Sequence, residues 1–535
     1  MEKGIRMGED VRDNADSGAL SRRKLLLAGA GGAGALMLAA CGGGGGTVMQ
    51  TLGSSQAPSG KPKPGGVLRV GLGGGSPAET FDAALVNGPA ATTRDQVFYE
   101  NLIWMDGTFG LENALIDEIT PNQANDSWTV RLKPEVEFHN GKTVSADDVV
   151  FTMNRILDPK VGATASGQYI NVLAATKKID ARTVRFDLNY ANVSFPKLLS
   201  DVTFIIPVGY DPQNPVSTGP WKFKSFVPGQ QTVLERFENY WGEKALADEL
   251  IMVELPDDTA RVNALLSGQV DAINQVPFVQ VPQLEGAGSF DVVASETAGF
   301  NPITMRVDVP PFDDVRVRQA MKLLISREQA ISSALSGQGQ VAADYFGRFD
   351  EGFKGPKREQ DVEEAQSLLK QAGRQDEAFE LVTSPIAAGI VKATEVLAEN
   401  AKEAGVNVTT KLAEPSSYFS RYGKWPFAID YWVGLPYLVT ASIANGPKAT
   451  VVNTTHFDDP EFNSLFFQAS KQADRGKREE LIEEMHKIEY ERGGFLIWAF
   501  QNTVDAYSNK LAGYDPVDRT AWGLSRCRLD RLGFV

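Results

Sequence analysis

The sequence predicts an α/β protein built from more than one globular lobe. The chain has 535 residues, of which 42% are hydrophobic, so it can bury a large core and divide into several domain-sized units. From residue 67 onward, strand-like and helix-like segments alternate along the chain. No internal repeat of the solenoid kind is present, which leaves mixed α/β lobes as the expected architecture.

Periodicity and capping residues predict the individual elements. Residues 67–70 form a short β-rich run, and residues 128–132 alternate between apolar and polar side chains in the manner of a half-buried strand. A helix should begin after Ser145, because Asp148 completes a capping-box pattern. Three further helices are predicted, one after Asp257 that ends at Gly268 before a strand over 270–273, one after Asp314 with Val317, Ala320, Met321 and Leu324 on one face, and one through Val362, Ala365, Leu368 and Leu369.

The first 41 residues have the pattern of an export signal with a lipid anchor. Arg22 and Arg23 precede an apolar run over 25–40, which ends in Leu-Ala-Ala before Cys41. The paired arginines resemble a twin-arginine signal, and the residues ending at Cys41 resemble the lipobox of bacterial lipoproteins. A single membrane span is the alternative, but the run is shorter and richer in glycine than a span needs. Residues 42–65, rich in Gly, Ser and Pro, are predicted to be a flexible tether.

Composition excludes a nucleic-acid partner. The chain carries 53 Lys and Arg against 68 Asp and Glu, a formal net charge of -15, so it has no excess of cations to neutralise phosphates. Only two cysteines occur, Cys41 and Cys527. If Cys41 is lipidated, the mature chain has no intrachain disulfide.

Catalytic, cofactor and metal motifs are missing from the sequence. The three histidines, His139, His456 and His486, form no zinc-binding pair, and His486 with Glu489 is expected to lie on a solvated helix face. There is no Cys-x-x-Cys, nucleophile elbow or Walker loop. The glycine-rich residues 71–76 lack the last glycine of a dinucleotide fingerprint, and Pro77 follows them. A backbone-lined ligand loop or an ordinary turn fits these residues better, so we expect a protein without cofactor that is not an enzyme.

Several longer motifs, in order, resemble the family 5 solute-binding proteins, which carry dipeptides, oligopeptides and nickel. The clearest is WTVRLKPEVEFHNGK over 128–142, which is followed by SADDV over 145–149. The later motifs are STGPW over 217–221, YWG over 240–242, LLSGQVD over 265–271, PFDDVRVRQA over 311–320, SRE over 326–328 and DPEF over 459–462. Together they cover residues 65–514, and so many motifs in one order do not arise by chance.

The resemblance implies a two-lobe, periplasmic-binding-protein-like fold of the cluster C type with a hinge between the lobes. Lobe I would comprise 66–298 and 500–535, with an inserted subdomain over 83–210, and lobe II would comprise 299–499. The lobes would close on a peptide-like or other small polar solute and deliver it to an ABC permease and its ATPase. We expect a monomer that acts outside the membrane, held there by the lipid on Cys41.

The resemblance also implies ligand-binding positions, carried over residue by residue. Gly75 and Ser76 match a pocket loop of lobe I, and Tyr431 and Trp432 match a loop of lobe II whose Trp packs against the ligand. Without the resemblance, Trp432 would be interpreted as a core aromatic. For Trp498, Phe500 and Asn502, which lie near the return crossing between the lobes, core packing and ligand contact are equally good readings. Tyr345 and Phe346 are weaker candidates.

Two residues depart from the pattern of the peptide carriers. Leu435 occupies the place of the Asp that pairs with the ligand's α-ammonium group, and Arg306 replaces a usual Asn. Because leucine cannot neutralise a buried cation, we hypothesise a ligand without a free ammonium at that point. Its carboxylate would be bound by Arg306, unless Arg306 pairs with Asp308 at the surface instead.

Two other functional classes are alternatives to a transport protein. A sensor or adhesive surface lipoprotein could use the same fold, and the sequence does not separate it from a transport protein. An extracellular hydrolase is disfavoured, because no constellation of nucleophile and base is present. The identity of the solute does not follow from the sequence.

Overall fold

The computed structural model describes residues 60–535 except 87, 351, 356, 448, 450 and 451. The predicted signal, Cys41 and most of the predicted tether lie outside the described residues. Within the predicted tether, Lys63 pairs with Phe534 and Gly65 donates its N–H to the Leu246 carbonyl, so these two residues contact the folded body. In the described part of the chain, no helix combines the length and apolar character that a membrane crossing requires.

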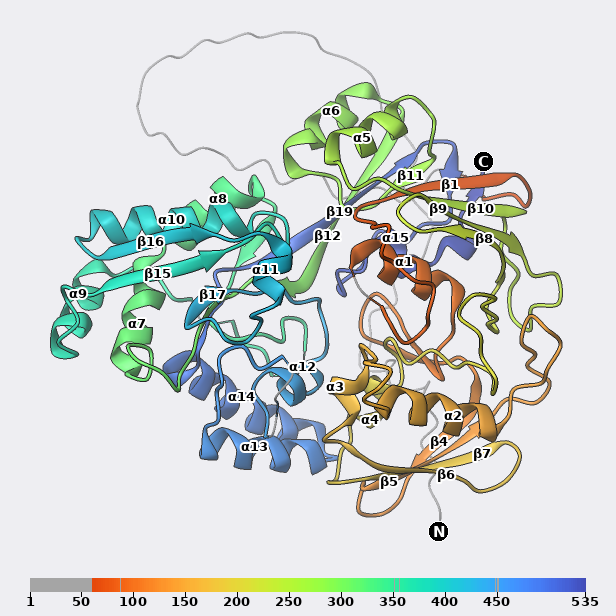
Figure 1. Cartoon of the computed structure of the whole chain (residues 1–535), viewed down its shortest axis with the longest axis horizontal. Coiled ribbons are helices and arrows are strands. Elements are labelled where there is room, and N and C mark those ends of the chain that lie inside the picture. Colours follow the sequence, from red (N-terminus) through yellow and green to blue (C-terminus); the bar gives the residue numbers. More distant parts are fainter. Residues whose placement is uncertain (1–59, 87, 351, 356, 448, 450–451) are drawn as a thin grey trace, which may run out of the picture. The chain divides into compact units, whose positions relative to one another are not determined.

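The largest sheet has eight strands and collects both early and late parts of the chain (Figure 1). β1 lies at its centre and pairs in parallel with β10 and β11, with Val70 opposite Met252, while the other pairs are antiparallel. Alternate residues of β1 are fully buried, as its short β-rich run predicted. The strands in order are β12 (Phe290–Phe300), β19 (Ala499–Ser508), β11 (Ala272–Ile273), β1 (Val67–Leu72), β10 (Glu249–Glu254), β9 (Gln231–Arg236) and β8 (Trp221–Val227), with β14 (Gly339–Val341) paired to β19.

A separate four-stranded sheet forms within residues 116–188. Its predicted strand is present as β5, which buries Trp128, Val130 and Leu132 on one face. The helix predicted after Ser145 is also present as α2, and the carboxylate of Asp148 accepts hydrogen bonds from the Ser145 N–H and hydroxyl at 2.9 and 2.7 Å. These elements are β4 (Ile116–Pro121), β5 (Ser127–Leu132), β7 (Thr183–Leu188), β6 (Leu173–Lys178) and α2 (Ala146–Leu157), with α3 (Ser166–Tyr169) and α4 (Phe195–Leu198) beside them.

Helices α5, α7 and α9 confirm the remaining helix predictions. Asp257 and Asp314 cap α5 and α7 by accepting backbone N–H groups, and the predicted face of α7 is buried. Gly268, at φ 71°, follows the end of α5 in the left-handed conformation that glycine adopts readily. The helices are α5 (Asp258–Leu266), α7 (Val315–Leu324), α8 (Arg327–Leu335), α9 (Val362–Gln371), α10 (Ile390–Glu403), α12 (Tyr437–Ala444), α13 (Pro460–Lys471) and α14 (Arg475–Arg492).

Residues 303–496 contribute two small sheets. One has the order β17-β13-β18, and the other is the parallel pair β15-β16. Val382 and Leu381 of β15 are buried, while most of β16 is exposed. The strands are β13 (Ile303–Met305), β15 (Ala378–Thr383), β16 (Asn407–Leu412), β17 (Phe427–Ile429) and β18 (Phe495–Leu496).

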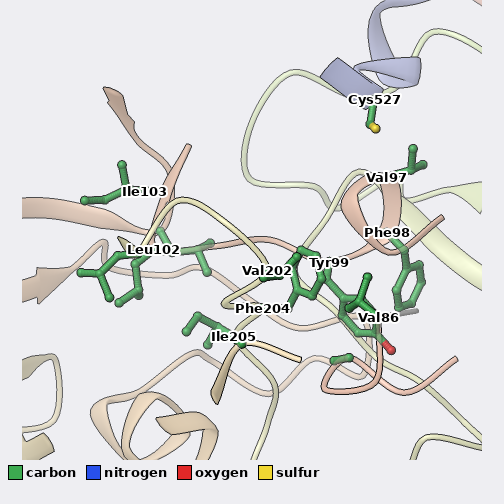
Figure 2. Close-up of a cluster of buried hydrophobic side chains, with 14 of the residues drawn as sticks. Val86, Val97, Phe98, Tyr99, Leu102, Ile103, Val202, Phe204, Ile205 and Cys527 are labelled. Carbon is green, nitrogen blue, oxygen red and sulfur yellow. The ribbon is translucent and has the colours of Figure 1, made fainter. Parts of the chain in front are cut away.

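The apolar core is divided in the same way as the sheets. One cluster joins the eight-stranded and four-stranded sheets, and others lie around β13 and α7 and around α13 and α14. Figure 2 shows part of the first cluster, where Tyr99 stacks on Phe204 at 5.4 Å between ring centroids. Cys527 lies near Val97 in the same view, and it is a buried, unpaired thiol whose pKa is raised to about 12 by burial. Buried apolar area of this kind is the main force that holds each lobe together.

Candidate functional site

Two long strands connect the eight-stranded sheet with the elements of residues 303–496. β12 and β19 lie side by side as an antiparallel pair, in which Glu296 faces Asn502 and, after a bulge, Phe300 faces Phe500 (Figure 1). In the bulge, Thr297 donates its hydroxyl to the Gln501 carbonyl, and Gly299 donates its N–H to that hydroxyl. Bulges re-aim side chains, and beyond this one Phe300 pairs both with Phe500 of β19 and with Trp432.

Trp432 belongs to a stack of three nearly parallel aromatic rings. Its ring lies 6.1 Å from Phe300 at an interplanar angle of 5°, and Phe300 lies 5.7 Å from Phe346 at 7°. Backbone hydrogen bonds of 2.9 and 3.0 Å tie Trp432 and Phe300 to each other in both directions. Trp432 is 8% exposed, whereas Phe300 and Phe346 are 1% exposed, so the stack forms an apolar wall in which Trp432 keeps the largest exposed fraction.

The carboxylate of Asp430 holds the indole in place. It accepts hydrogen bonds from the Trp432 Nε1 at 3.2 Å, the Tyr422 hydroxyl at 2.9 Å and the Thr454 hydroxyl at 3.1 Å. Burial raises the pKa of Asp430 to about 6, although these bonds and one from the Tyr431 N–H lower it. Sequence analysis missed Asp430, because nothing in its local pattern distinguishes it from an acid on the surface.

Tyr431 and Leu435 lie in different surroundings. Tyr431 is 42% exposed, so its ring is available to a solute. Leu435 is buried together with Val439 of α12 in the core cluster of the first sheets. The place of the expected acid is therefore apolar, as the leucine predicted.

Arg306 forms the alternative pairing that the sequence left open. Its Nε and Nη2 bind the two carboxylate oxygens of Asp308 at 3.0 and 2.7 Å, and its Nη1 lies 3.4 Å from the Lys424 carbonyl. His456 also contacts Asp308, at 3.1 Å. Asp308 thus engages the guanidinium fork in a bidentate pair.

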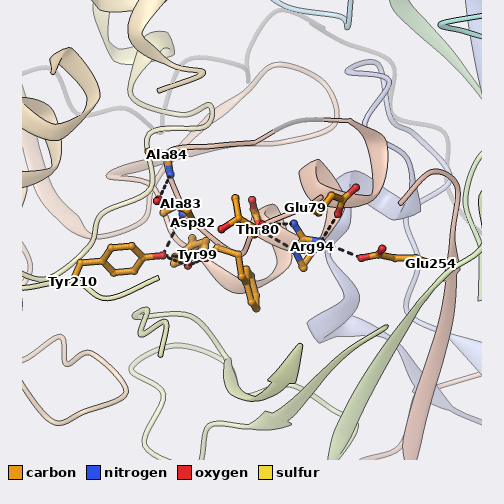
Figure 3. A network of polar contacts seen from close by, with 11 residues as sticks. Glu79, Thr80, Asp82, Ala83, Ala84, Arg94, Tyr99, Tyr210 and Glu254 are labelled. Atoms are coloured by element: carbon orange, nitrogen blue, oxygen red, sulfur yellow. Dashed lines mark hydrogen bonds and ion pairs between the residues drawn. The ribbon is translucent and has the colours of Figure 1, made fainter. Parts of the chain in front are cut away.

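The glycine loop that contains Gly75 and Ser76 rests on a buried charge cluster, shown in Figure 3. Gly75 has φ 111°, and a Cβ there would lie 2.7 Å from Glu254, so only glycine fits. Glu254 in turn binds Arg94 at 3.1 Å. Arg94 also binds Glu79 at 2.8 Å and Asp95 at 3.2 Å, and it donates to the Thr80 carbonyl.

The charge cluster has one cation for three carboxylates. One oxygen of Asp95 and one of Glu254 are buried without a hydrogen-bond partner. Burial raises the pKa of Asp95 to about 7, against the attraction of Arg94. No hydrogen bond, ion pair or ring contact among the described residues joins this cluster to Trp432, so the structure leaves these candidate positions as two separate groups.

The candidates on the return crossing differ in burial. Trp498 is 1% exposed and packs in the core around β13 and α7, as one of its two readings proposed. Phe500 is equally buried. Asn502 is half-buried and binds Gln338 through its backbone and side chain, while its own side-chain oxygen has no partner.

The prediction for His486 and Glu489 is wrong. Both side chains are buried, since α14 packs this face on Tyr345, Tyr437 and Asn445 rather than turning it to water. Burial lowers the pKa of His486 to about 3 and raises that of Glu489 to about 8. Tyr345 and Phe346 are buried as well, and Tyr345 stacks on His486 at 4.4 Å.

Sequence analysis also missed two arginines near the crossing. The guanidinium carbons of Arg348 and Arg519 lie 4.5 and 4.6 Å from the centre of the Phe349 ring. These residues come from distant segments and belong to none of the motifs that carry the resemblance. Among the described residues, no group of His, Cys, Asp and Glu side chains is arranged to hold a metal ion. An open hollow lined by Asn122, Asp126, Ser127 and Arg185 on the four-stranded sheet contains no candidate residue.

Comparisons with known proteins agree with this architecture. The oligopeptide-binding protein AppA of Bacillus subtilis is 25% identical over 497 residues, covering 86% of this chain and 91% of that protein. The glutathione-binding protein GsiB of Pectobacterium atrosepticum is 24% identical over 472 residues, covering 82% and 90%. The structure of AgaA from A. tumefaciens R10 in complex with agropinic acid matches with a TM-score of 0.79 at 22% identity, covering 88% and 99%.

These matches confirm the two-lobe fold of periplasmic binding proteins that the sequence predicted. The model of the bacterial extracellular solute-binding proteins, family 5, matches residues 110–445, well over half of the chain. This family binds solutes and does not consist of enzymes. The chain therefore belongs to the family 5 extracellular solute-binding proteins and has the substrate-binding role of that family in ABC import.

Proposed function

We propose that this protein is a lipid-anchored, monomeric carrier that captures a peptide-like or other small polar solute and presents it to an ABC permease and its ATPase. The observation that carries the proposal is the strand pair β12 and β19, which links the parts of the molecule and bears the aromatic wall at its end. In a protein of this kind, the solute binds better to the closed arrangement of the lobes and so increases its population.

The pocket surface we propose consists of the aromatic wall and half-buried polar groups. Trp432, held by Asp430, offers a small exposed part of its apolar ring, and Tyr431 offers a more exposed side chain with its hydroxyl. Asn502 adds an amide whose oxygen has no partner in the protein. The Gly75–Ser76 loop would close the site from the other lobe with backbone groups. Few polar groups against apolar walls are typical of pockets that accept varied solutes.

The class of solute follows from what the pocket lacks. The named relatives bind oligopeptides, glutathione and agropinic acid. In this chain, Leu435 is buried among apolar side chains, and a free ammonium placed there would have no carboxylate partner. We therefore propose a solute without a free α-ammonium at that point.

Native mass spectrometry of the purified protein tests the carrier function. We expect a small solute to co-purify unchanged and to leave on mild denaturation. Titration with tripeptides and their N-acetylated forms then tests the solute class, since the acetylated forms should bind at least as tightly as the free ones. A strict requirement for a free amine would contradict the role of Leu435, and chemical turnover of a bound peptide would contradict the carrier function itself.

The anchor is tested by replacing the proposed lipid-bearing residue. Cys41→Ala should release the protein from the membrane fraction, because no lipid would be attached. Fractionation of cells and the mass of the mature chain measure the result. Cys527→Ala is the matched control, since Cys527 is buried in the folded body and should leave the location unchanged. An unchanged membrane location of Cys41→Ala would refute the lipid anchor.

A further inference from the structure

Arg348 and Arg519 form a pair of cations with too few acids around them. Both guanidinium groups contact the Phe349 ring, at 4.5 and 4.6 Å from its centre, so their central carbons are at most about 9 Å apart. Arg348 also lies 5.9 Å from the centre of Phe500 on β19. We call Arg348, Phe349 and Arg519 the arginine pair site.

Glu296 supplies the acid of this site. It binds Arg348 at 2.6 Å and accepts a hydrogen bond from Gln340 at 3.2 Å. Arg519 makes no side-chain hydrogen bond or ion pair with any residue that the structure describes, and its recorded contact is the Phe349 ring. Among the described residues, one carboxylate therefore pairs with one of the two guanidinium groups, and the other has no acid partner.

Other acids near the site are engaged elsewhere. Asp350, beside Phe349, accepts the Tyr437 N–H and faces Lys197 at 3.9 Å. Asp518, next to Arg519, is buried and accepts hydrogen bonds from the Thr520 and Gly523 N–H groups. Among the residues that the structure describes, the arginine pair site thus keeps one positive charge without a partner acid.

Arg348 has one donor group that makes no hydrogen bond. Its Nη1 is buried without a hydrogen-bond partner, an expensive state for a charged donor. Burial lowers the pKa of its guanidinium below the ordinary value, and the like charge of Arg519 adds to this effect while Glu296 opposes it. An anion beside the ring would satisfy the donor and reduce the repulsion between the two cations.

The site lies beside the aromatic wall. The Arg519 carbonyl accepts the Ala298 N–H at 2.9 Å, and the neighbouring Thr520 carbonyl accepts the Gly434 N–H at 2.9 Å, two residues after Trp432. Glu296 faces Asn502 across the strand pair. Backbone hydrogen bonds therefore connect the segment of Arg519 with the β12 strand and with the segment of Trp432.

We infer that the arginine pair site is an oxyanion subsite, which binds a carboxylate or phosphate of the captured solute through Arg348 and Arg519. This inference rests on the proposed solute-binding function. Arg306, which the sequence suggested for contact with a carboxylate of the solute, is already paired with Asp308. We therefore assign this contact to Arg348 and Arg519. Guanidinium groups suit this role, since their planar donors match oxyanion geometry.

Matched probe pairs test the inference by calorimetric titration. The pairs are acetyl-trialanine and its C-terminal amide, and glucose 6-phosphate and glucose, which separate a carboxylate from a phosphate source. Sodium sulfate, compared with sodium chloride at equal ionic strength, serves as the minimal oxyanion in thermal unfolding. We expect the anionic member of at least one pair to bind about ten- to a hundredfold more tightly than its neutral partner.

Arg519→Gln and Arg348→Gln should each remove the preference for the anionic probe. Arg519→Gln breaks no ion pair, so it keeps the test valid if Arg348→Gln disturbs the fold around Glu296. Arg316→Gln is the control, since Arg316 pairs with Asp314 on an exposed part of α7. If sulfate and every anionic probe affect wild type and Arg519→Gln alike, the inference is wrong. In that case, a neutral solute that binds both proteins equally would leave the carrier function intact, whereas the absence of any bound solute would refute the carrier function too.

Discussion

The cluster around Arg94 and the arginine pair site differ in burial and in the ratio of acids to cations. Arg94 is 1% exposed in its side chain and is surrounded by three carboxylates, all from residues 79–254. At the arginine pair site, two half-buried cations from distant segments share one exposed acid. The first arrangement has an excess of acids around one fully buried cation and serves the fold, while the second has an excess of cations that are only half-buried and lie open to a solute. Under the inference above, an unbalanced charge therefore marks a binding site only where a solute has access to it.

Replacing Arg94 gives the largest expected effect. Arg94→Met should lower the free energy of unfolding at pH 7 by about 3–5 kcal/mol, because Glu79, Asp95 and Glu254 would remain buried without their cation. Urea unfolding followed by circular dichroism measures the loss. Arg316→Met should show no measurable change, and an equally small loss for Arg94→Met would remove the contrast between the two regions.

Asp95 makes the same cluster sensitive to pH. Its pKa is about 7 in the folded protein against an ordinary value of 3.8, so the native state holds the proton more tightly than the unfolded state. Its contribution to stability is therefore complete below pH 4 and is lost as the pH rises to 7. Relative to Asp95→Asn, the wild type should lose about 1 kcal/mol of unfolding free energy per pH unit in that window. Parallel curves for the two proteins between pH 4 and 7 would contradict this assignment.

Removing the acid of the arginine pair site should act in two directions. Glu296→Gln deletes the partner of Arg348 and should cost up to about 1 kcal/mol of stability, since this pair is partly exposed. The same change should tighten binding of the preferred oxyanion probe several-fold, because Glu296 no longer competes for Arg348. Calorimetric titration and urea unfolding of one preparation provide both numbers. Weaker binding would show that Glu296 itself contacts the solute.

Arg519 should be almost dispensable for folding. Arg519→Gln should change the free energy of unfolding by less than about 0.5 kcal/mol without solute, since no ion pair is lost and repulsion with Arg348 is relieved. The loss of unfolding free energy should therefore be several kcal/mol smaller for Arg519→Gln than for Arg94→Met under identical conditions. This difference separates an arginine that stabilises the fold from one that is available to a solute. A loss as large as that of Arg94→Met would assign Arg519 to the fold.

Local pattern predicted the elements well, because the relevant forces act between near neighbours. The caps at Asp257 and Asp314 and the alternation in β5 are visible in a few consecutive residues, and the structure contains each of them. The motifs also predicted the family. Of the aromatic wall, Trp432 and, as a weaker candidate, Phe346 were singled out by sequence, whereas Phe300 was not, and the stacking of the three rings was not predicted because they come from separate segments.

The remainder of the site depends on contacts that no local pattern reveals. Arg348 and Arg519 both contact Phe349, which has φ 71°, although they come from distant segments. His486 is buried because the rings of Tyr345, Phe353 and Tyr437 pack on it. Arg306 pairs with Asp308, two residues away. Burial and charge balance are properties of the folded chain, so no short stretch of sequence determines them.

The hydrogen bond from Ala298 to the Arg519 carbonyl joins charge recognition to the linking strand. Two residues further along that strand, the Phe300 backbone is bonded in both directions to Trp432. A solute that moves Arg519 therefore also displaces β12, the strand that carries Phe300 of the aromatic wall. Capture of the anion and adjustment of the wall would then proceed as one mechanical event rather than as two successive contacts.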